Sequence, residues 1–327
     1  MAMKLRWLSV LIMIAIALLA PSLIATQTYL LHVIIVILLY ATLAQTWNLL
    51  ASYAGQASLG QALFFGMGAY TVGLLTLYTE YFRTNPWPAL ILGGFIASLL
   101  GLGVGAICFR LRGPYFALAT LAATEIARLI ILNTDFTKGA IGIIISAPPS
   151  IATPFFVINF HEKLPYYYIA LSLMITSFYV VYILSKSRYG LLLQSIRDDE
   201  DAAMTLGVNT FRLKLFTIFV SGSIAGVTGS LYAVYTGFID PSMDPGGVLT
   251  LFTSIEPVII TVLGGAGTII GPLIGSLLRV GGGEYLRILF GWRAGMDLIV
   301  FGVLFILIFF YARKGIWGSI KTKIRLV

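Results

Sequence analysis

The sequence contains little charge, and this scarcity excludes a soluble protein. Only 10% of its 327 residues are charged, compared with about 25% in a typical soluble domain. Hydrophobic residues make up 59% of the chain, and its mean hydropathy is +0.96. A soluble fold could not bury this much apolar surface, so lipid must surround most of the chain.

Cysteine and histidine are scarce, and a phosphate-binding loop is missing. The single cysteine, Cys108, excludes an internal disulfide, and two histidines, His32 and His161, are too few for a histidine-rich metal centre. No G-x-x-x-x-G-K-[ST] sequence occurs, so another chain would have to supply energy from nucleotide hydrolysis. We therefore expect no metal, no cofactor and no enzymatic activity.

Long apolar runs take the place of these groups. A membrane span needs about 20 predominantly apolar residues. Ten runs are candidates, namely 7–25, 30–50, 57–78, 88–109, 114–133, 166–184, 215–236, 248–264, 267–281 and 296–312. The predicted fold is an all-α polytopic membrane protein with about eight to ten transmembrane helices, some short or broken.

Three of these runs need an interpretation of their own. The run 7–25 follows a basic start, as in a signal peptide, but the many later runs favour an uncleaved span. The runs 248–264 and 267–281 are short and are interrupted by Pro257 and several glycines. They predict either two crossings or a re-entrant pair, and both arrangements return the chain to the same side.

The distribution of Lys and Arg predicts the topology. Short cytoplasmic loops are enriched in these residues. With the N-terminus inside, the inner segments carry fourteen of them and the outer segments five. We therefore expect both termini in the cytoplasm and one transmembrane domain over 1–327, whose main cytoplasmic connection is 185–214. The net charge of +8 then reflects topology and not a nucleic-acid partner.

Small residues recur at every fourth position in three runs. Such stripes let helix backbones approach closely in a membrane. The simpler interpretation is packing within the chain, and the alternative is a subunit seam or a sliding surface. The stripes are Ala97, Gly101 and Gly105; Gly222, Gly226 and Ser230; and Gly267, Gly271 and Gly275.

Two acidic residues fall inside predicted spans. Glu125 lies three residues before Arg128, so the two share a helix face, and structural pairing is the first interpretation. Glu256 precedes Pro257, which removes a helix hydrogen bond. A glutamate beside a broken helix can line a polar cavity, so Glu256 is equally a structural and a functional candidate.

The cytoplasmic segment 198–207 reads "DDEDAAMTLG" and predicts a helix of about two turns. Asp198 suits the N-cap, the following acidic residues suit the first turn, and Gly207 suits a left-handed end. This helix is either a well-capped connector or a docking element.

The segment resembles the cytoplasmic E-A-A-x-x-x-G motif of ABC-importer permeases. Asp201, Ala202, Ala203 and Gly207 match its spacing, with Asp in place of Glu. "YAGQASLGQALFFGMGAY" at 53–70 and "SIEPVIITVLGGAGTIIGPLIGSLL" at 254–278 resemble blocks of the branched-chain amino acid permease family of the LivM type. The resemblance covers about residues 30–312. Gln61 stands where many members have histidine, and "TKGAIGI" replaces a more glycine-rich sequence, so urea or short amides remain alternative solutes.

The resemblance implies a permease subunit of an importer in the inner (plasma) membrane. It implies a second, related permease, two ABC ATPases that dock on the cytoplasmic side, and an extracytoplasmic substrate-binding protein. The residues implied in ATPase coupling are Arg197, Asp198, Asp201, Ala202, Ala203 and Gly207.

The uncharged polar residues of 53–70 are candidates for the solute path. Gln56, Ser58 and Gln61 lie among glycines, without an ionic partner in sequence. With Glu256 they are predicted to line the path, and the alternative is that they bond to neighbouring helices. In another class, an ion-coupled secondary transporter, Glu125 and Glu256 would carry the coupling.

Overall fold

The computed structural model describes residues 27–152, 157–241, 247–290, 295–311 and 315–319. The predicted span 7–25 lies outside the described residues. The described elements are almost all helical, as predicted, and they follow the order α2 (Thr28–Asn48), η1 (Leu49–Tyr53), α3 (Gln61–Tyr78), α4 (Glu80–Thr84), α5 (Trp87–Cys108), α6 (Pro114–Leu132), η2 (Asp135–Thr137), η3 (Gly139–Ile141), β1 (Ile143–Ile144), β2 (Ile151–Ala152), β3 (Val157–Ile158), α7 (Leu164–Lys186), α8 (Arg188–Asp198), α9 (Glu200–Thr205), α10 (Thr210–Thr236), β4 (Phe238–Ile239), α11 (Leu251–Gly264), α12 (Gly271–Ser276), η4 (Leu277–Gly281), α13 (Gly282–Leu289) and α14 (Met296–Tyr311).

Six helical runs in the described chain are long and apolar enough to cross a membrane. They are α2 with the π-helical turn η1, then α3, α5, α6, α7 and α10. The two-residue strands form two small antiparallel pairs, β1 with β4 and β2 with β3. The predicted class, an all-α polytopic membrane protein, is therefore confirmed.

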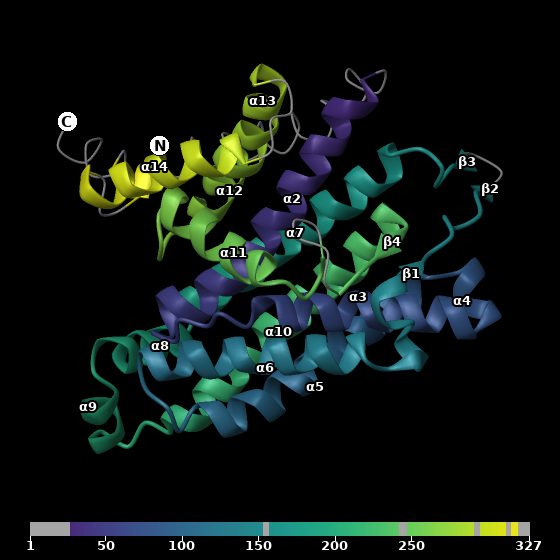
Figure 1. The fold of residues 1–327 in the computed structure, drawn as a ribbon. Coiled ribbons are helices and arrows are strands. Elements are labelled where there is room, and N and C mark those ends of the chain that lie inside the picture. The colour runs from purple at the N-terminus through teal and green to yellow at the C-terminus, as the bar shows by residue number, and fades with distance from the viewer. Residues whose placement is uncertain (1–26, 153–156, 242–246, 291–294, 312–314, 320–327) are drawn as a thin grey trace.

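Helix α10 lies at the centre of the bundle and packs on α5 and α3 (Figure 1). Glycine makes these contacts possible, because a Cβ on Gly226 would lie 2.9 Å from the carbonyl oxygen of Gly93. A Cβ on Gly229 would lie only 1.8 Å from the carbonyl oxygen of Phe65. On the α5 side, Gly101 and Gly105 both face Ile218 of α10. Two of the three small-residue stripes thus meet each other inside the chain.

The third stripe is only partly helical. Gly271 and Gly275 lie on α12 and pack against the backbone of α11. Gly267 lies before the helix with a φ of 76°, so the predicted stripe of three glycines is helical only from Gly271. From Gly271 the helical elements continue as α12, η4 and α13 to Leu289, beyond the predicted end at 281. The π-helical turn η4 absorbs the local change in helical register.

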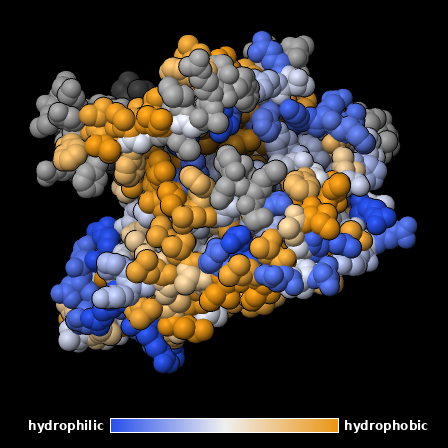
Figure 2. Space-filling model, viewed as in Figure 1, coloured by the Kyte–Doolittle hydropathy of each residue, from blue (hydrophilic) through white to orange (hydrophobic). Residues whose placement is uncertain are grey.

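An apolar belt surrounds the bundle. In Figure 2 hydrophobic side chains cover the middle of the molecule and hydrophilic ones gather at two ends. Large apolar side chains on the outer faces of α5 and α6 are exposed, among them Ile91, Ile107, Leu118 and Ile130. Lipid is the solvent that suits such a belt. We call the end that carries α8 and α9 the coupling end, and the end that carries the strands the opposite end (Figure 1).

Candidate functional site

A cavity of about 260 Å³ lies in the half of the bundle nearer the opposite end. We call it the central cavity. It is lined by the first half of α2, the last turns of α10, and the helices α11, η4 and α13, and it is open on one side. Its lining residues are His32, Val36, Tyr40, Tyr232, Thr236, Glu256, Arg279, Val280, Gly283, Glu284 and Arg287.

An ion pair lies in the wall of the central cavity. The Nη2 atom of Arg279 donates to Oε1 of Glu256 at 2.5 Å, and both side chains are largely shielded, with exposed fractions of 9% and 19%. The guanidinium also lies 4.9 Å from the ring centre of Phe301. Its buried Nε has no hydrogen-bond partner among the described residues. A charged pair at this depth is costly unless it is well compensated.

Both members of this ion pair lie where their helix departs from regular α-helical geometry. Glu256 lies one residue before Pro257, inside α11. Arg279 belongs to the π-helical turn η4. Such turns are frequently found at functional sites. The sequence pointed to Glu256 but did not pair it with Arg279, although opposite charges in two adjacent short apolar runs were a usable signal.

A second ion pair lies on α13, in the same wall of the central cavity. Arg287 donates to Glu284 at 2.9 Å within α13, and the hydroxyl of Tyr29 donates to Glu284 at 2.8 Å. Nδ1 of His32 lies 2.6 Å from the hydroxyl of Tyr235. His32 and Thr236 also line a larger cavity of about 520 Å³ at the opposite end. The two cavities therefore adjoin each other.

The predicted path residues of 53–70 do not line the central cavity. Ser58 and Gln61 are completely buried. The Ser58 hydroxyl accepts from the Gly60 N–H at 3.0 Å, and the Gln61 amide donates to Ser221 at 3.4 Å. Gln56 is half-buried, and its amide donates to the carbonyl oxygen of Ala54.

One contact connects this stretch with the wall of the cavity. The N–H of Ala62 donates to the hydroxyl of Ser254 at 3.3 Å, two residues before Glu256. The buried Oε1 of Gln61 has no hydrogen-bond partner among the described residues. The structure thus places Gln61 near α11, and on the coupling side of the cavity.

The remaining acidic candidate lies away from the cavity. Arg128 donates to both carboxylate oxygens of Glu125, at 2.6 and 2.9 Å, on α6. Neither residue lines the central cavity.

Comparison with known proteins identifies the family. The profile described as "Branched-chain amino acid transport system / permease component" matches residues 29–309. The chain belongs to this family. It is therefore a multi-pass membrane permease component, which is not an enzyme in itself.

The relatives have low sequence identity to this chain, but the LivM proteins match most of its length. The high-affinity branched-chain amino acid transport system permease protein LivM of Escherichia coli is 27% identical over 88% of this chain and 70% of its own length. The probable LivM protein of Methanocaldococcus jannaschii is 27% identical over 85% of this chain and 90% of its own length. The fructose import permease protein FrcC of Rhizobium meliloti is 28% identical over 56% of this chain and 53% of its own length. No solved structure matches the chain significantly.

At the coupling end of the permease, α9 is a short, capped helix. Asp199 is its N-cap and accepts from the N–H of Ala202 at 3.0 Å, so the prediction of Asp198 as N-cap was wrong by one residue. Asp198 instead ends α8 and pairs with Arg197 at 2.8 Å. Gly207 closes the segment with a φ of 83°, as the left-handed end requires.

Two ion pairs fix the α9 helix to the rest of the protein, whereas the C-terminal end of the helix is exposed. Arg112 binds both carboxylate oxygens of Asp201, at 2.8 and 2.9 Å, and this contact lowers the pKa of Asp201. The buried Lys214 donates to Glu200 at 2.6 Å. Leu206 is 83% exposed and Met204 is also exposed, so the tip presents an apolar surface.

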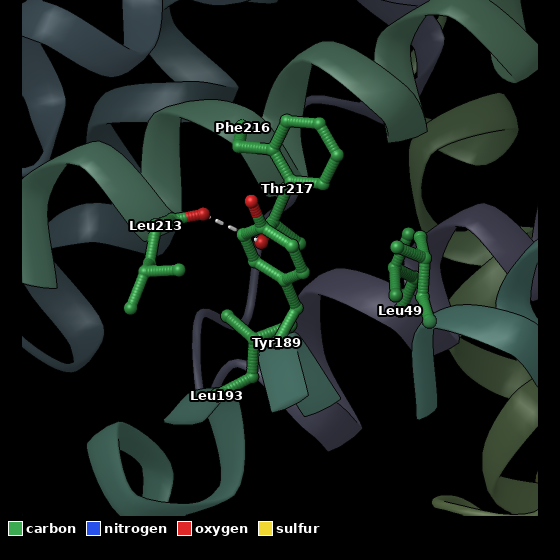
Figure 3. Close-up of a pocket in the computed structure, with 7 residues that line it drawn as sticks. Leu49, Tyr189, Leu193, Leu213, Phe216 and Thr217 are labelled. Carbon is green, nitrogen blue, oxygen red and sulfur yellow. Dashed lines mark hydrogen bonds between the residues drawn. The ribbon is translucent and has the colours of Figure 1, made fainter. Parts of the chain in front are cut away.

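Helix α8 fastens this element to the permease bundle. Figure 3 shows Tyr189 and Leu193 of α8 pointing toward Phe216 of α10, in a small apolar pocket that Leu49 of η1 also lines. The rings of Tyr189 and Phe216 stack with centres 5.5 Å apart. Helix α8 therefore contacts both η1 and α10.

A polar contact reaches further. Arg197 donates to the carbonyl oxygen of Ser52 in η1 at 3.1 Å. Gly55 adopts a φ of 70°, and a Cβ there would lie 3.0 Å from the Cα of Arg197. The glycine therefore allows the backbones of α8 and the 54–60 link to approach closely.

From η1 the contacts continue to the helices of the central cavity. The side chain of Asn48, next to η1, donates to the carbonyl oxygen of Thr268 and accepts from the N–H of Gly267, both at 2.9 Å. These residues form the turn between α11 and α12. A continuous set of contacts thus joins the coupling end to the helices that carry Glu256 and Arg279.

Proposed function

We propose that this permease is the membrane-spanning subunit of an ATP-driven importer for branched-chain or other small amino acids. Its partners would be a second, related permease, two ABC ATPases and an extracytoplasmic substrate-binding protein. The relatives named for branched-chain amino acid transport support the solute class. Another relative is named for fructose import, so the solute has to be identified by an uptake experiment.

The observation that carries the proposal is the set of contacts that leads from α8, next to α9, through η1 and Asn48 to the turn between α11 and α12. A surface helix with an exposed apolar tip suits docking into an ATPase cleft. Arg197, Asp198, Asp201, Ala202, Ala203 and Gly207 belong to this coupling region. Closure of the ATPases would move α8 and α9, and the contacts of Arg197 and Asn48 would pass the movement to α11 and α12.

The solute path in this proposal has two halves. The central cavity with Glu256 forms the outer half, and Gln56, Ser58 and Gln61 form the inner half when the bundle opens toward the coupling end. Such a path needs weak polar contacts, because tight binding would trap the solute. The buried oxygen of Gln61 supports this placement, since it has no hydrogen-bond partner in the described structure.

Uptake by the reconstituted complex tests the proposal. Proteoliposomes that contain both permeases and both ATPases are supplied with the binding protein outside and ATP inside. We expect accumulation of leucine and valine but not of urea, and no accumulation without ATP. Transport driven by a proton or sodium gradient alone would instead identify a secondary transporter.

A further inference from the structure

The central cavity carries charges of both signs in close proximity. Two acids, Glu256 and Glu284, and two arginines, Arg279 and Arg287, line it, so their formal charges cancel. An anion or a cation alone gains little from a wall without net charge. A solute that carries both charges can find an opposite charge for each.

The helical elements η4 and α13 carry three of these groups, and the fourth, Glu256, lies on α11. Arg279, Gly283 and Arg287 follow one another at intervals of four residues, and Glu284 adjoins them. Gly283 has no side chain, and a Cβ there would lie 3.3 Å from Nη1 of Arg279. The absence of a side chain at Gly283 therefore lets the guanidinium lie close to the helix backbone, and both residues line the cavity.

Much of the remaining lining is apolar or aromatic. Val36 and Tyr40 of α2, Tyr232 of α10 and Val280 form these surfaces, and His32 and Thr236 add polar groups where the larger cavity adjoins. The volume of about 260 Å³ corresponds to roughly nine water molecules in the liquid. The space thus suits a small amphipathic solute with one charged end and one apolar end.

We propose that the central cavity binds the zwitterionic head group of an α-amino acid, with Arg279 taking the carboxylate and Glu256 taking the ammonium group. This inference rests on the proposed function, because it takes the solute to be an amino acid. Binding exchanges one ion pair within the protein for two ion pairs with the solute, so no charge is left without a counter-charge. The apolar side chain of the solute then lies against Val36, Tyr40 and Tyr232.

The exchange explains why a buried pair suits a transporter. A buried ion pair adds little net stability, since its desolvation offsets its attraction. The pair can therefore open for a solute without a large loss of stability. It also keeps both charges satisfied when the cavity is empty, and this would make binding weak enough for release.

The test uses half-analogues of the solute on the complete complex without its binding protein. Radiolabelled leucine is equilibrated with the complex in nanodiscs and displaced by leucine, by leucinamide, which lacks the carboxylate, or by 4-methylpentanoate, which lacks the amine. We expect each half-analogue to compete at least about tenfold less well than leucine, because each lacks one charged contact.

Single variants should then change specificity in opposite directions. In Arg279→Gln, leucinamide should compete as well as leucine, and in Glu256→Gln, 4-methylpentanoate should do so. Arg128→Gln and Glu125→Gln remove the ion pair of α6, which does not line the cavity, and should keep the wild-type order. If a single variant does not assemble, the double variant Glu256→Gln/Arg279→Gln leaves no unpaired charge and should bind with no preference for the zwitterion.

Three results would overturn the inference. The first is that the wild-type complex does not bind leucine. The second is that both half-analogues compete as well as leucine for the wild-type complex. The third is that the Arg279 and Glu256 variants keep the wild-type preference for leucine over both half-analogues. ATP-driven leucine uptake by the wild-type complex, measured in parallel, keeps the proposed function separate. If uptake occurs and the order of competitors fails, the binding site is wrong and the importer stands; if only another solute is taken up, the proposed function is wrong as well.

Discussion

At the scale of single residues, a substitution of Gln61 tests whether the stretch 53–70 lines the solute path or only holds helices together. Its amide makes one long interhelical bond, to Ser221 at 3.4 Å, and interhelical bonds in membranes average only about 0.6 kcal/mol. Gln61→Leu should therefore change the thermal stability of the complex little. If Gln61 lies on the path, leucine uptake should fall while ATP hydrolysis continues, and both are measured in proteoliposomes.

The control for Gln61 is another buried polar residue that bonds only within its own helix. Thr42 donates to the carbonyl oxygen of Leu38 in α2 at 2.8 Å and is completely buried. Thr42→Val has nearly the same shape and should leave uptake unchanged. Wild-type uptake by Gln61→Leu, and by Gln56→Leu and Ser58→Ala, would make the whole stretch a scaffold.

At the scale of elements, the end of α9 depends on Gly207. A β-branched residue at its φ of 83° is a genuine outlier, so Gly207→Val should displace the tip that we assign to ATPase docking. We expect an inserted permease with uptake and coupled ATPase activity reduced at least several-fold. Gly103→Val is the control, because Gly103 has an ordinary φ and open space on the exposed face of α5. Normal transport by Gly207→Val would make α9 a connector only.

The contact between α8 and the 54–60 link can be tested in the same way. Gly55→Ala adds a left-handed strain of about 1–2 kcal/mol, and its Cβ would lie 3.0 Å from the Cα of Arg197. Gly295→Ala also places a side chain at a positive φ, of 85°, with nothing within 4 Å of the new Cβ. We expect Gly55→Ala to hydrolyse ATP with little leucine uptake, and Gly295→Ala to couple normally. Equal behaviour of the two variants would exclude a role for the close approach.

At the scale of the whole molecule, the bundle has two polar ends, and the distribution of Lys and Arg predicts that the coupling end lies inside the cell. Thr205, next to the tip of α9, and His161, beside the larger cavity, are exposed at opposite ends. Single cysteines at these positions, in a Cys108→Ala background, are treated with an impermeant thiol reagent in intact cells. We expect labelling at 161 and none at 205 until the cells are opened. The reverse pattern would invert the topology and the direction of transport.

Hydropathy, charge and glycine spacing determined much of this protein from its sequence. Long apolar runs predicted the membrane class because each span needs enough apolar residues to cross the lipid. The acidic first turn and Gly207 predicted α9, because capping depends on the nearest residues in the chain. Even here the predicted N-cap, Asp198, differs by one residue from the observed N-cap, Asp199. The two residues are chemically alike, so only the fold selects between them.

Contacts between residues far apart in sequence were decided by tertiary structure alone. Glu256 and Arg279 lie 23 positions apart and meet because α11 and α12 pack antiparallel through glycine. Arg197 meets Ser52 across 145 positions, and no periodicity within a segment encodes such a pairing. Composition and local spacing determine which residues enter the membrane and where helices end, whereas the packing of those helices decides which charges share a cavity.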